Sequence, residues 1–269
     1  MIDGGSSDDS TDILHRYNAH LDNWISEADD GQSTAINKGF SKSSGEILAW
    51  LNSDDMYAPG ALHCVGAIFR DSHAAVVSGN AVFTDAEGRP EQRFDAAALD
   101  LRRLLRVRGG FTAPQQSTFF SRACWERHGP LSEDLHYLMD TELWIKMAAA
   151  KEPWRITNKD LAFFRHHPAQ KTADLSTNLA LLRERDRMLE RFAVTPYCRP
   201  CYRRDVRRGL RENRVKQVRV AFLTQPHDCR YRPYLIRAAR RHPECLLVPA
   251  FYGMLILGIR APLQDVLRT

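Results

Sequence analysis

One short segment constrains the fold of this chain more than any other. Residues 46–55 read Glu-Ile-Leu-Ala-Trp-Leu-Asn-Ser-Asp-Asp, an apolar run of strand length that ends in the adjacent carboxylates Asp54 and Asp55. A buried strand cannot carry paired acids in its interior without a large desolvation cost, so the pair must emerge at the strand's end, where a cation or hydrogen-bond donors can meet it. The residues alone leave a second interpretation open, a polar turn after a strand, because turns are commonly rich in Asp.

The hydrophobic pattern around this segment predicts alternating strands and helices, an α/β protein. We expect strands at 46–52, 75–84 and 117–120, and helices at 7–17, 31–40 (which Gly39 ends) and 175–192. Asp140 recurs with Leu143, Trp144 and Met147 at helical spacing, which puts it at the N-terminus of a helix. On the 175–192 helix we expect the arginines to form a solvated face: Arg183, Arg185, Arg187 and Arg191.

Charge is distributed unevenly along the 269 residues. Residues 1–60 hold eleven acidic and three basic side chains, which suits a divalent cation. Residues 199–241 hold fourteen basic and three acidic side chains, a composition that favours anionic lipid, nucleic acid or plain solvation. No nucleic-acid motif accompanies the basic block and few aromatic residues interleave it, so we do not expect a nucleic-acid partner.

Cysteine use and the first residues indicate a cytoplasmic protein. The six cysteines are scattered, without the density of a secreted disulfide scaffold, and we expect reduced thiols. Cys198-Arg199-Pro200-Cys201 is a lone CxxC, a weak signal for zinc or redox chemistry. The opening Met1-Ile2-Asp3-Gly4 lacks the basic start and apolar core of a signal peptide.

Several further segments accompany the Asn52-Ser53-Asp54-Asp55 end, in a fixed order. They are Met1-Ile2-Asp3-Gly4-Gly5-Ser6-Ser7-Asp8, Asp30-Gly31-Gln32-Ser33-Thr34-Ala35-Ile36-Asn37-Lys38-Gly39, Pro114-Gln115-Gln116-Ser117-Thr118-Phe119-Phe120, Met139-Asp140-Thr141-Glu142-Leu143-Trp144, Phe164-Arg165-His166-His167 and Lys171-Thr172. Together they resemble family 2 glycosyltransferases of the GT-A fold, over roughly residues 1 to 190. Each segment is weakly specific alone, and their order and spacing make the resemblance specific.

The resemblance implies a Rossmann-like GT-A mixed sheet flanked by helices. We expect a catalytic core over residues 1–172, a helical Arg-rich extension over 173–241 and an apolar segment over 242–269. Family members normally place a strand, a helix and a further strand before the segment that matches Asp3, so the expected core is incomplete at its N-terminus. Gly4 stands where many relatives have a second Asp.

The family's chemistry is the transfer of a sugar from a nucleoside diphosphate to an acceptor hydroxyl with inversion. A hard divalent cation, Mn²⁺ or Mg²⁺, neutralises the leaving diphosphate. The resemblance implies Asp55 as a metal ligand and His167 as a second ligand or a contact to the diphosphate. For His167 the residues alone equally allow a structural role. It also implies a set of residues that bind the nucleotide and donor sugar: Asp3, Gln32, Asn37, Lys38, Asp54 and Arg165. For Lys38 the residues alone equally allow a cation at a helix C-terminus.

Asp140 matches the family position of the base that takes the acceptor's proton. Its alternative interpretation is an Asp that caps the helix that follows. Glu142 is a weaker candidate for the base. Gln115 and Gln116 lie in a segment that, by the resemblance, borders the active-site cleft.

The sequence is compatible with three different functions. The first is a metal-assisted transferase with a nucleotide-sugar donor and a carbohydrate or lipid-linked acceptor, acting in cell-surface polysaccharide or glycan synthesis. The second is a truncated pseudoenzyme or fragment that binds a partner. The third is a peripheral membrane module at the inner face of the cell membrane, since the basic block precedes the apolar run at 245–259, which is too short to span a bilayer. Packing of that run against the protein is the equal alternative.

Overall fold

The computed structural model describes residues 1–106, 113–167 and 175–223, together with Arg240 and Pro243. The chain forms two compact units. The first comprises Met1–Ala98, Thr112–Met147 and Lys151–His166, and the second comprises Leu99–Phe111, Ala148–Ala150 and His167–Thr269. The domain boundaries expected from the sequence stay predictions.

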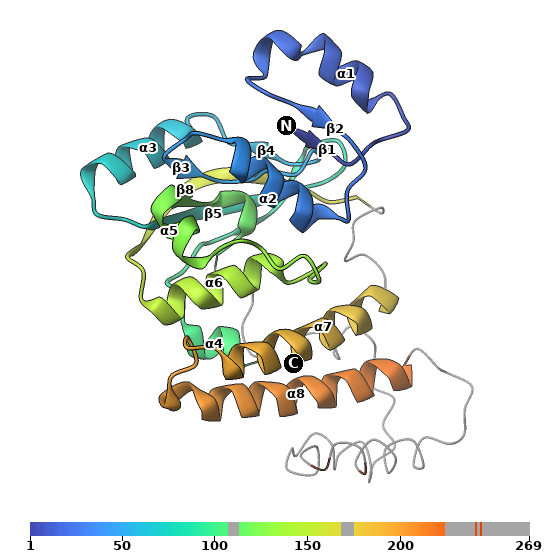
Figure 1. The fold of residues 1–269 in the computed structure, drawn as a ribbon, viewed down its shortest axis with the longest axis vertical. Helices are drawn as coiled ribbons and strands as arrows, with labels where there is room; N and C mark the ends of the chain where they lie inside the picture. The colour runs from blue at the N-terminus through green and yellow to red at the C-terminus, as the bar shows by residue number, and fades with distance from the viewer. Residues whose placement is uncertain (107–112, 168–174, 224–239, 241–242, 244–269) are drawn as a thin grey trace. The chain divides into compact units, whose positions relative to one another are not determined.

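The first unit is built on a mixed sheet whose central strand is β5 (Val76–Thr84) (Figure 1). The strands run in the order β3-β7-β5-β8-β4, and β6 also pairs with β5. The bounds of the other strands are β3 (Ile47–Leu48), β4 (Met56–Tyr57), β6 (Pro90–Phe94), β7 (Thr118–Ser121) and β8 (Trp154–Arg165). Of these pairings only β5–β8 is parallel. Almost every residue of β5 is buried, which is typical of a strand covered on both faces.

Helices pack on this sheet by apolar faces. The helices of the unit are α1 (Ser10–Arg16), α2 (Gln32–Lys42), α3 (Ala61–Asp71), α5 (Arg122–His128) and α6 (Met139–Ala150), the last of which ends in the second unit. Ala61 and Val65 of α3 are buried against Val77, Phe119 and Leu161 of the sheet. This burial follows the helical spacing of the apolar residues in α3.

An aromatic cluster connects α2, α5 and α6 to the sheet. The Trp50 and Trp144 rings are stacked with centroids 6.0 Å apart, and the Phe120 and Trp125 rings are stacked at the same separation. Phe40 of α2 meets Trp125 edge-on at 4.7 Å. Such pairs add about 0.5–1.5 kcal/mol each beyond the burial of their area. The cluster therefore holds the chain on either side of the Asp54-Asp55 segment in place.

A small parallel pair of strands completes the first unit. β1 (Ile2–Asp3) pairs with β2 (Ile25–Ser26), so that Asp3 lies opposite Ser26. The short 3₁₀ helix η1 (Asn18–His20) lies between α1 and β2 in the chain. Gly39 of α2 approaches Ile2, and a Cβ built on Gly39 lies 3.3 Å from the Ile2 side chain. We expected Gly39 to end its helix, which is wrong: α2 continues to Lys42, and the glycine instead allows β1 to pack closely.

The strand expected over 46–52 is shorter in the structure, because β3 ends at Leu48. The carbonyl of Trp50 accepts a hydrogen bond of 2.6 Å from the Gln115 side chain instead of from a neighbouring strand. Gln115 belongs to the 3₁₀ helix η2 (Gln115–Ser117), all of whose residues are buried. A side-chain amide thus replaces the sheet ladder just before the paired carboxylates.

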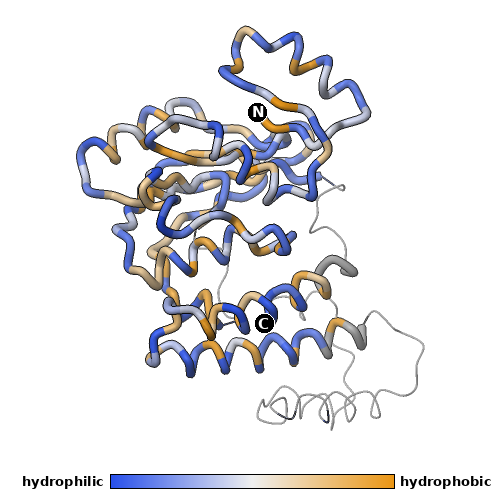
Figure 2. Tube along the Cα trace, in the orientation of Figure 1, coloured by the Kyte–Doolittle hydropathy of each residue, from blue (hydrophilic) through white to orange (hydrophobic). Residues whose placement is uncertain are grey.

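The second unit contains α4 (Leu101–Leu105), α7 (Leu175–Val194), the 3₁₀ helix η3 (Pro200–Tyr202) and α8 (Arg203–Leu223). α7 and α8 run side by side, and apolar residues recur among hydrophilic ones along both helices (Figures 1 and 2). Met188, Leu189, Val206 and Val215 are buried. No helix within the described ranges is long and apolar enough to cross a membrane.

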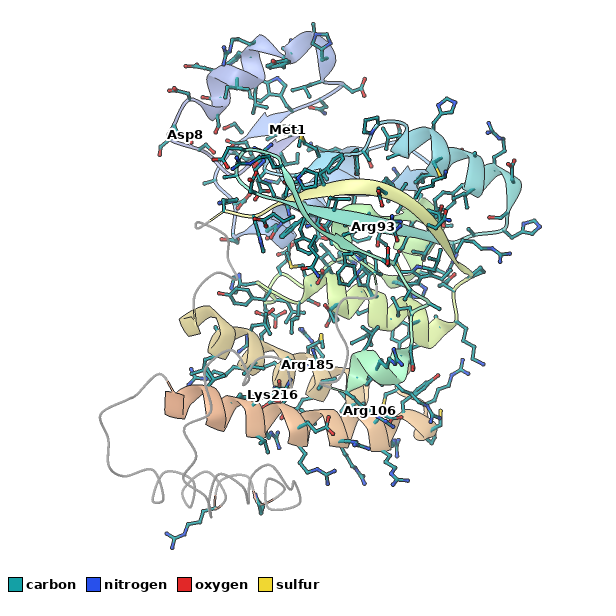
Figure 3. The ribbon with its side chains drawn as sticks, turned by 180° about the vertical axis from the view of Figure 1, so that it is seen from behind. Met1, Asp8, Arg93, Arg106, Arg185 and Lys216 are labelled. Carbon is teal, nitrogen blue, oxygen red and sulfur yellow. The ribbon has the colours of Figure 1, made fainter. Side chains whose placement is uncertain are left out.

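Polar contacts also hold the second unit together (Figure 3). Arg185 of α7 donates to the backbone carbonyls of Leu104 at 2.7 Å and Arg106 at 2.9 Å, and desolvation lowers the pKa of its guanidinium. The prediction of a solvated arginine face is therefore wrong for Arg185. Asp205 of α8 is buried and pairs with Arg106 and Arg102. The arginine content of this unit thus partly serves its interior.

Gly79 of β5 tests how tightly the sheet is packed. A Cβ built there lies 2.5 Å from the Leu161 side chain and 2.8 Å from the Lys159 carbonyl. We expect Gly79→Ala to destabilise the protein by about 1–3 kcal/mol, the usual cost of overpacking a core. In the matched control Gly66→Ala, on α3 of the same unit, the added methyl meets nothing within 4 Å, and we expect stabilisation by roughly 0.5–1 kcal/mol. Urea unfolding measures both, and equal effects of the two substitutions would contradict the packing described here.

Candidate active site

Asp54 and Asp55 lie between β3 and β4 in the chain, beyond the apolar run in which the sequence predicts a strand. Asp55 is buried, with 6% of its surface exposed, whereas Asp54 is partly exposed. The backbone N–H of Asp55 donates to the Asn52 carbonyl at 3.1 Å, which closes a turn just before the pair. β4 then pairs with β8, where Met56 lies opposite Phe163, and this pairing brings the end of β8 to Asp55.

Three hydrogen-bond donors from separate segments converge on the Asp55 carboxylate. The Arg165 backbone N–H donates to Oδ1 at 3.2 Å, the Asn52 side chain donates to Oδ2 at 3.3 Å, and the Gln116 side chain donates as well. Gln32 of α2 in turn donates to the Asn52 side-chain oxygen at 2.7 Å. Because both ends of the Asn52 amide are engaged, the network fixes the direction of the Asp55 carboxylate.

The electrostatics of this carboxylate are unfavourable without a cation. Burial, followed by the negative charge of Asp54, raises the pKa of Asp55 to about 6 despite its hydrogen bonds. Carboxylate and amide oxygens are the ligands that hard divalent cations prefer. The side chains around Asp55 therefore fit a divalent ion, which would offset the repulsion between the two acids.

Asp3 of β1 accepts hydrogen bonds from several neighbours. Its carboxylate accepts from the Ser26 hydroxyl at 2.7 Å, the Ser6 hydroxyl at 2.5 Å and the backbone N–H groups of Gly5 and Ser6. These bonds, with that of Ser26 foremost, lower the pKa of Asp3 to about 2. A Cβ built on Gly4 lies 2.9 Å from the Asp29 carboxylate, so Asp29 occupies the space beside the glycine.

Two predicted donor-binding residues of α2 are engaged in contacts within the protein. Lys38 pairs with Glu27 at 2.7 Å and lowers the pKa of that carboxyl. Asn37 exchanges hydrogen bonds with the backbone of Leu131: its Nδ2 donates to the carbonyl at 3.0 Å, and its Oδ1 accepts from the N–H at 2.9 Å. Asn37 thus holds the loop after α5, and the donor-binding role of both residues stays a prediction.

Asp140 lies in the first turn of α6, as the sequence predicts. Its Oδ1 accepts from the backbone N–H of Thr141 at 2.5 Å and from the Thr141 hydroxyl at 3.2 Å. Glu142 is buried and engaged by the Ser132 hydroxyl at 2.5 Å and by Lys146 at 3.1 Å. Glu142 is thus occupied by contacts within the protein, and the role of Asp140 as the base stays a prediction.

The segment Phe164-Arg165-His166-His167 is divided between the two units. Arg165 belongs to the first unit, where its backbone contacts Asp55. The exposed His166 lies against the Phe83 and Phe164 rings and 3.8 Å from Glu91. His167 belongs to the second unit, and its metal role stays a prediction. Lys171 and Thr172 lie outside the described residues.

Sequence reasoning assigned no role to Asn52 and Ser26, although both are engaged here. Asn52 orients Asp55, and the hydrogen bond from Ser26 is the largest single cause of the lowered pKa of Asp3. The position of Asn52 within Asn-Ser-Asp-Asp offered a local signal, because Asn side chains commonly bond to groups a few residues away. Ser26 gave none, since its contact depends on the pairing of β1 with β2.

The sequence profile described as Glycosyl transferase family 2 matches residues 1–129, a range that includes Asp3, Asp54, Asp55 and Gln116. Over this range, just under half of the chain, the sequence is similar to glycosyltransferase family 2. An uncharacterised glycosyltransferase of Nostoc sp. is 30% identical over 90 residues, which cover 30% of this chain and 28% of the relative. An uncharacterised glycosyltransferase of Mycobacterium tuberculosis is 26% identical over 160 residues, 57% of this chain and 58% of the relative. The chain thus matches less than two thirds of the length of either family relative.

Solved structures show the same fold. S. aureus TarS 1-349 in complex with UDP-GlcNAc matches with a TM-score of 0.60 at 14% identity, over 95% of this chain and 73% of TarS 1-349. The same TarS segment in complex with UDP matches with a TM-score of 0.56 over 99% of this chain and 76% of that one. Our expectations of a family 2 glycosyltransferase and of a GT-A mixed sheet flanked by helices are confirmed.

The low pKa of Asp3 is open to a direct test. We expect Ser26→Ala to raise the pKa of Asp3 from about 2 toward the ordinary 3.8, because it removes the largest contribution to the shift. In the folded protein this acid favours folding above its ordinary pKa and loses that contribution as the pH falls through about 2, so the substitution moves the loss to higher pH. Carboxyl ¹³C NMR titration measures the shift.

A matched control for this titration is Ser10→Ala, since Ser10 lowers the pKa of Asp8 and touches neither Asp3 nor Ser26. It should leave the titration of Asp3 unchanged. An unaltered Asp3 titration in Ser26→Ala would show that Ser26 does not hold this carboxylate in solution.

Proposed function

We propose that this chain transfers a sugar from a nucleoside diphosphate to an acceptor hydroxyl, with inversion and with the help of a divalent cation. The observation that carries the proposal is the Asp54-Asp55 pair of a family 2 segment, with the Asp55 carboxylate buried and oriented by Asn52, Gln116 and Arg165. A carboxylate in a plain polar turn has no need of three converging donors, so the arrangement supports a binding site.

Asp55 would hold the cation, and Asp54, which is more exposed, would hydrogen-bond the ribose or donor sugar. When bound, Mn²⁺ or Mg²⁺ supplies charge neutralisation to the diphosphate. Asn52 and Gln116 keep the Asp55 carboxylate in one orientation, which lowers the entropy lost on binding. Asp3, prearranged as an anion by Ser6 and Ser26, would accept hydrogen bonds from the nucleotide.

Asp140 would accept the proton of the acceptor hydroxyl. The acceptor oxygen then forms the new bond to the anomeric carbon while the bond from that carbon to the diphosphate oxygen breaks, and the electron pair leaves with the diphosphate. Attack from the face opposite the leaving group inverts the configuration. The hydrogen bonds from Thr141 to Asp140 Oδ1 orient its carboxylate.

Similarity to solved TarS structures guides the choice of donor. TarS binds UDP-GlcNAc and UDP in the solved complexes, which supports a uridine nucleotide as the first donor to test. We propose a carbohydrate or lipid-linked acceptor and a cytoplasmic place of action in cell-surface polysaccharide or glycan synthesis, at the inner face of the membrane if the acceptor is lipid-linked.

We expect Asp55→Ala to abolish metal-dependent donor binding, because it removes the oriented ligand of the cation. Calorimetric titration with UDP, GDP and TDP, each with and without Mn²⁺, measures this directly. The matched control is Asp71→Ala, a surface acid at the end of α3 with 74% of its side chain exposed, which should bind as the unaltered protein does. Metal-independent binding of every nucleotide, or equal binding by Asp55→Ala, would contradict the proposed role.

We expect Asp140→Asn to leave donor binding intact and to slow transfer by about 10²–10⁴-fold, the usual contribution of a general base. Glu142→Gln serves as the comparison, since Glu142 is engaged by Ser132 and Lys146 and should affect transfer only through stability. Product formation from the donor that binds in calorimetry measures both variants. Normal transfer by Asp140→Asn, with loss in Glu142→Gln, would assign the base to Glu142.

A further inference from the structure

A second group of potential ligands lies in the first unit among residues that have no role in the proposed transfer. One ligand atom from each of Cys124, His128 and Glu152 can be chosen so that all lie within 4.8 Å of one another. The exposed fraction is 0% for Cys124 and 5% for His128, and 10% for the side chain of Glu152. Buried polar side chains of three different ligand types are uncommon without a reason for their proximity.

Local structure accounts for the convergence. Cys124 and His128 are four residues apart on α5 and so lie on the same face of the helix. The Ser121 hydroxyl caps α5 by accepting from the Cys124 backbone N–H at 3.2 Å. Glu152 is brought up from the end of α6, where Lys151 turns the chain with a φ of 62° and the Glu152 N–H donates to the Met147 carbonyl at 3.1 Å.

The Glu152 carboxylate is held by two neighbours. His128 Nε2 lies 2.7 Å from its Oε1, and Arg127 donates from Nη2 to Oε2 at 2.9 Å and from Nε to Oε1 at 3.0 Å. Carboxylates that bind metals are themselves commonly hydrogen-bonded, which fixes their orientation. The contact between Arg127 Nη2 and Oε2 can therefore persist while Oε1 and the imidazole nitrogen turn toward an ion.

We propose that Cys124, His128 and Glu152 bind a thiophilic divalent cation, Zn²⁺ being the best match. Thiolate, imidazole and carboxylate are its three protein ligand types, and three of them leave a fourth position for water. Ligand atoms about 2.0–2.3 Å from one ion lie roughly 3–4 Å apart, so the group needs to contract by about 1 Å. Binding replaces the hydrogen bond between His128 and Glu152 and releases the thiol proton to solvent.

Without an ion, the side chain of Cys124 is a buried thiol beside Glu152. Burial, together with the negative charge of Glu152, raises the pKa of the Cys124 thiol to about 12, so the thiol stays protonated and packs as a small apolar group. A divalent cation reverses the sign of the local charge and stabilises the thiolate. Arg127, half of whose side chain is exposed, pairs with Glu152 at 2.9 Å.

The site would brace the chain that leads to the candidate base. His128 is followed by the loop in which Leu131 bonds to Asn37 and Ser132 bonds to Glu142 of α6. A bound ion would tie the start of this loop to the chain just before β8. The expected role is therefore structural, separate from the cation proposed at Asp55.

Co²⁺ is the probe for this site, because a cobalt–thiolate bond gives a charge-transfer absorption that oxygen and nitrogen ligands do not. We expect the full-length, metal-stripped protein to show this absorption on titration with Co²⁺, saturating at one equivalent, and Zn²⁺ to abolish it. Cys124→Ala should remove the absorption, and Glu152→Gln, which keeps the side-chain volume, should weaken Co²⁺ binding by about 10-fold or more. Asp55→Ala should leave the absorption unchanged.

Cys201→Ser is the matched control, since Cys201 is exposed and belongs to the lone Cys-Xxx-Xxx-Cys motif. It should keep the full absorption. Absence of a charge-transfer band in the unaltered protein, its survival in Cys124→Ala, or its loss in Cys201→Ser would overturn the proposal. If Cys124→Ala fails to fold, as judged by circular dichroism, unaltered Co²⁺ binding by Glu152→Gln overturns it equally.

Discussion

Asp55 carries a carboxylate to a position where 6% of the residue meets solvent, next to the second carboxylate of Asp54. An unpaired charge there would be costly, and the chain offsets that cost with donors from three segments: the turn after β3, the helix η2 and the end of β8. Each donor fixes the place of its own segment. The hydrogen bonds to this one buried side chain therefore constrain how the three segments are arranged.

The sheet brings these segments together because β7 and β8 both pair with β5. β8 runs parallel to β5 along most of its length, and β7 pairs antiparallel with the beginning of β5, which places η2 beside the sheet. The aromatic cluster of Phe40, Trp50, Phe120, Trp125 and Trp144 then supports the chain on which the carboxylates lie. A rigid apolar layer thus underlies a polar edge, the arrangement that oriented binding groups require.

The sequence was sufficient for the fold class, because this depends on local pattern, whereas the roles of the site acids stay predictions. The apolar run before Asp54 predicts a strand, of which β3 keeps only Ile47 and Leu48, and helical spacing places Asp140 in the first turn of α6. Features that depend on contacts between distant segments were missed or wrong. Gly39 lies inside α2, where the absence of a side chain leaves room for Ile2. The Arg185 side chain is buried because it donates hydrogen bonds to the carbonyls of Leu104 and Arg106. Ser26 contacts Asp3 only because β1 pairs with β2.

Paramagnetic NMR can show whether a divalent cation binds at the carboxylate of Asp55, as we propose. Addition of Mn²⁺ with UDP should selectively broaden the side-chain amide signals of Asn52 and Gln116 and the backbone amide signal of Arg165, because these groups hydrogen-bond that carboxylate. The side-chain amide of Gln217 on α8 provides a reference in the second unit. Broadening that spares Asn52, Gln116 and Arg165 while affecting other acidic segments would contradict the account.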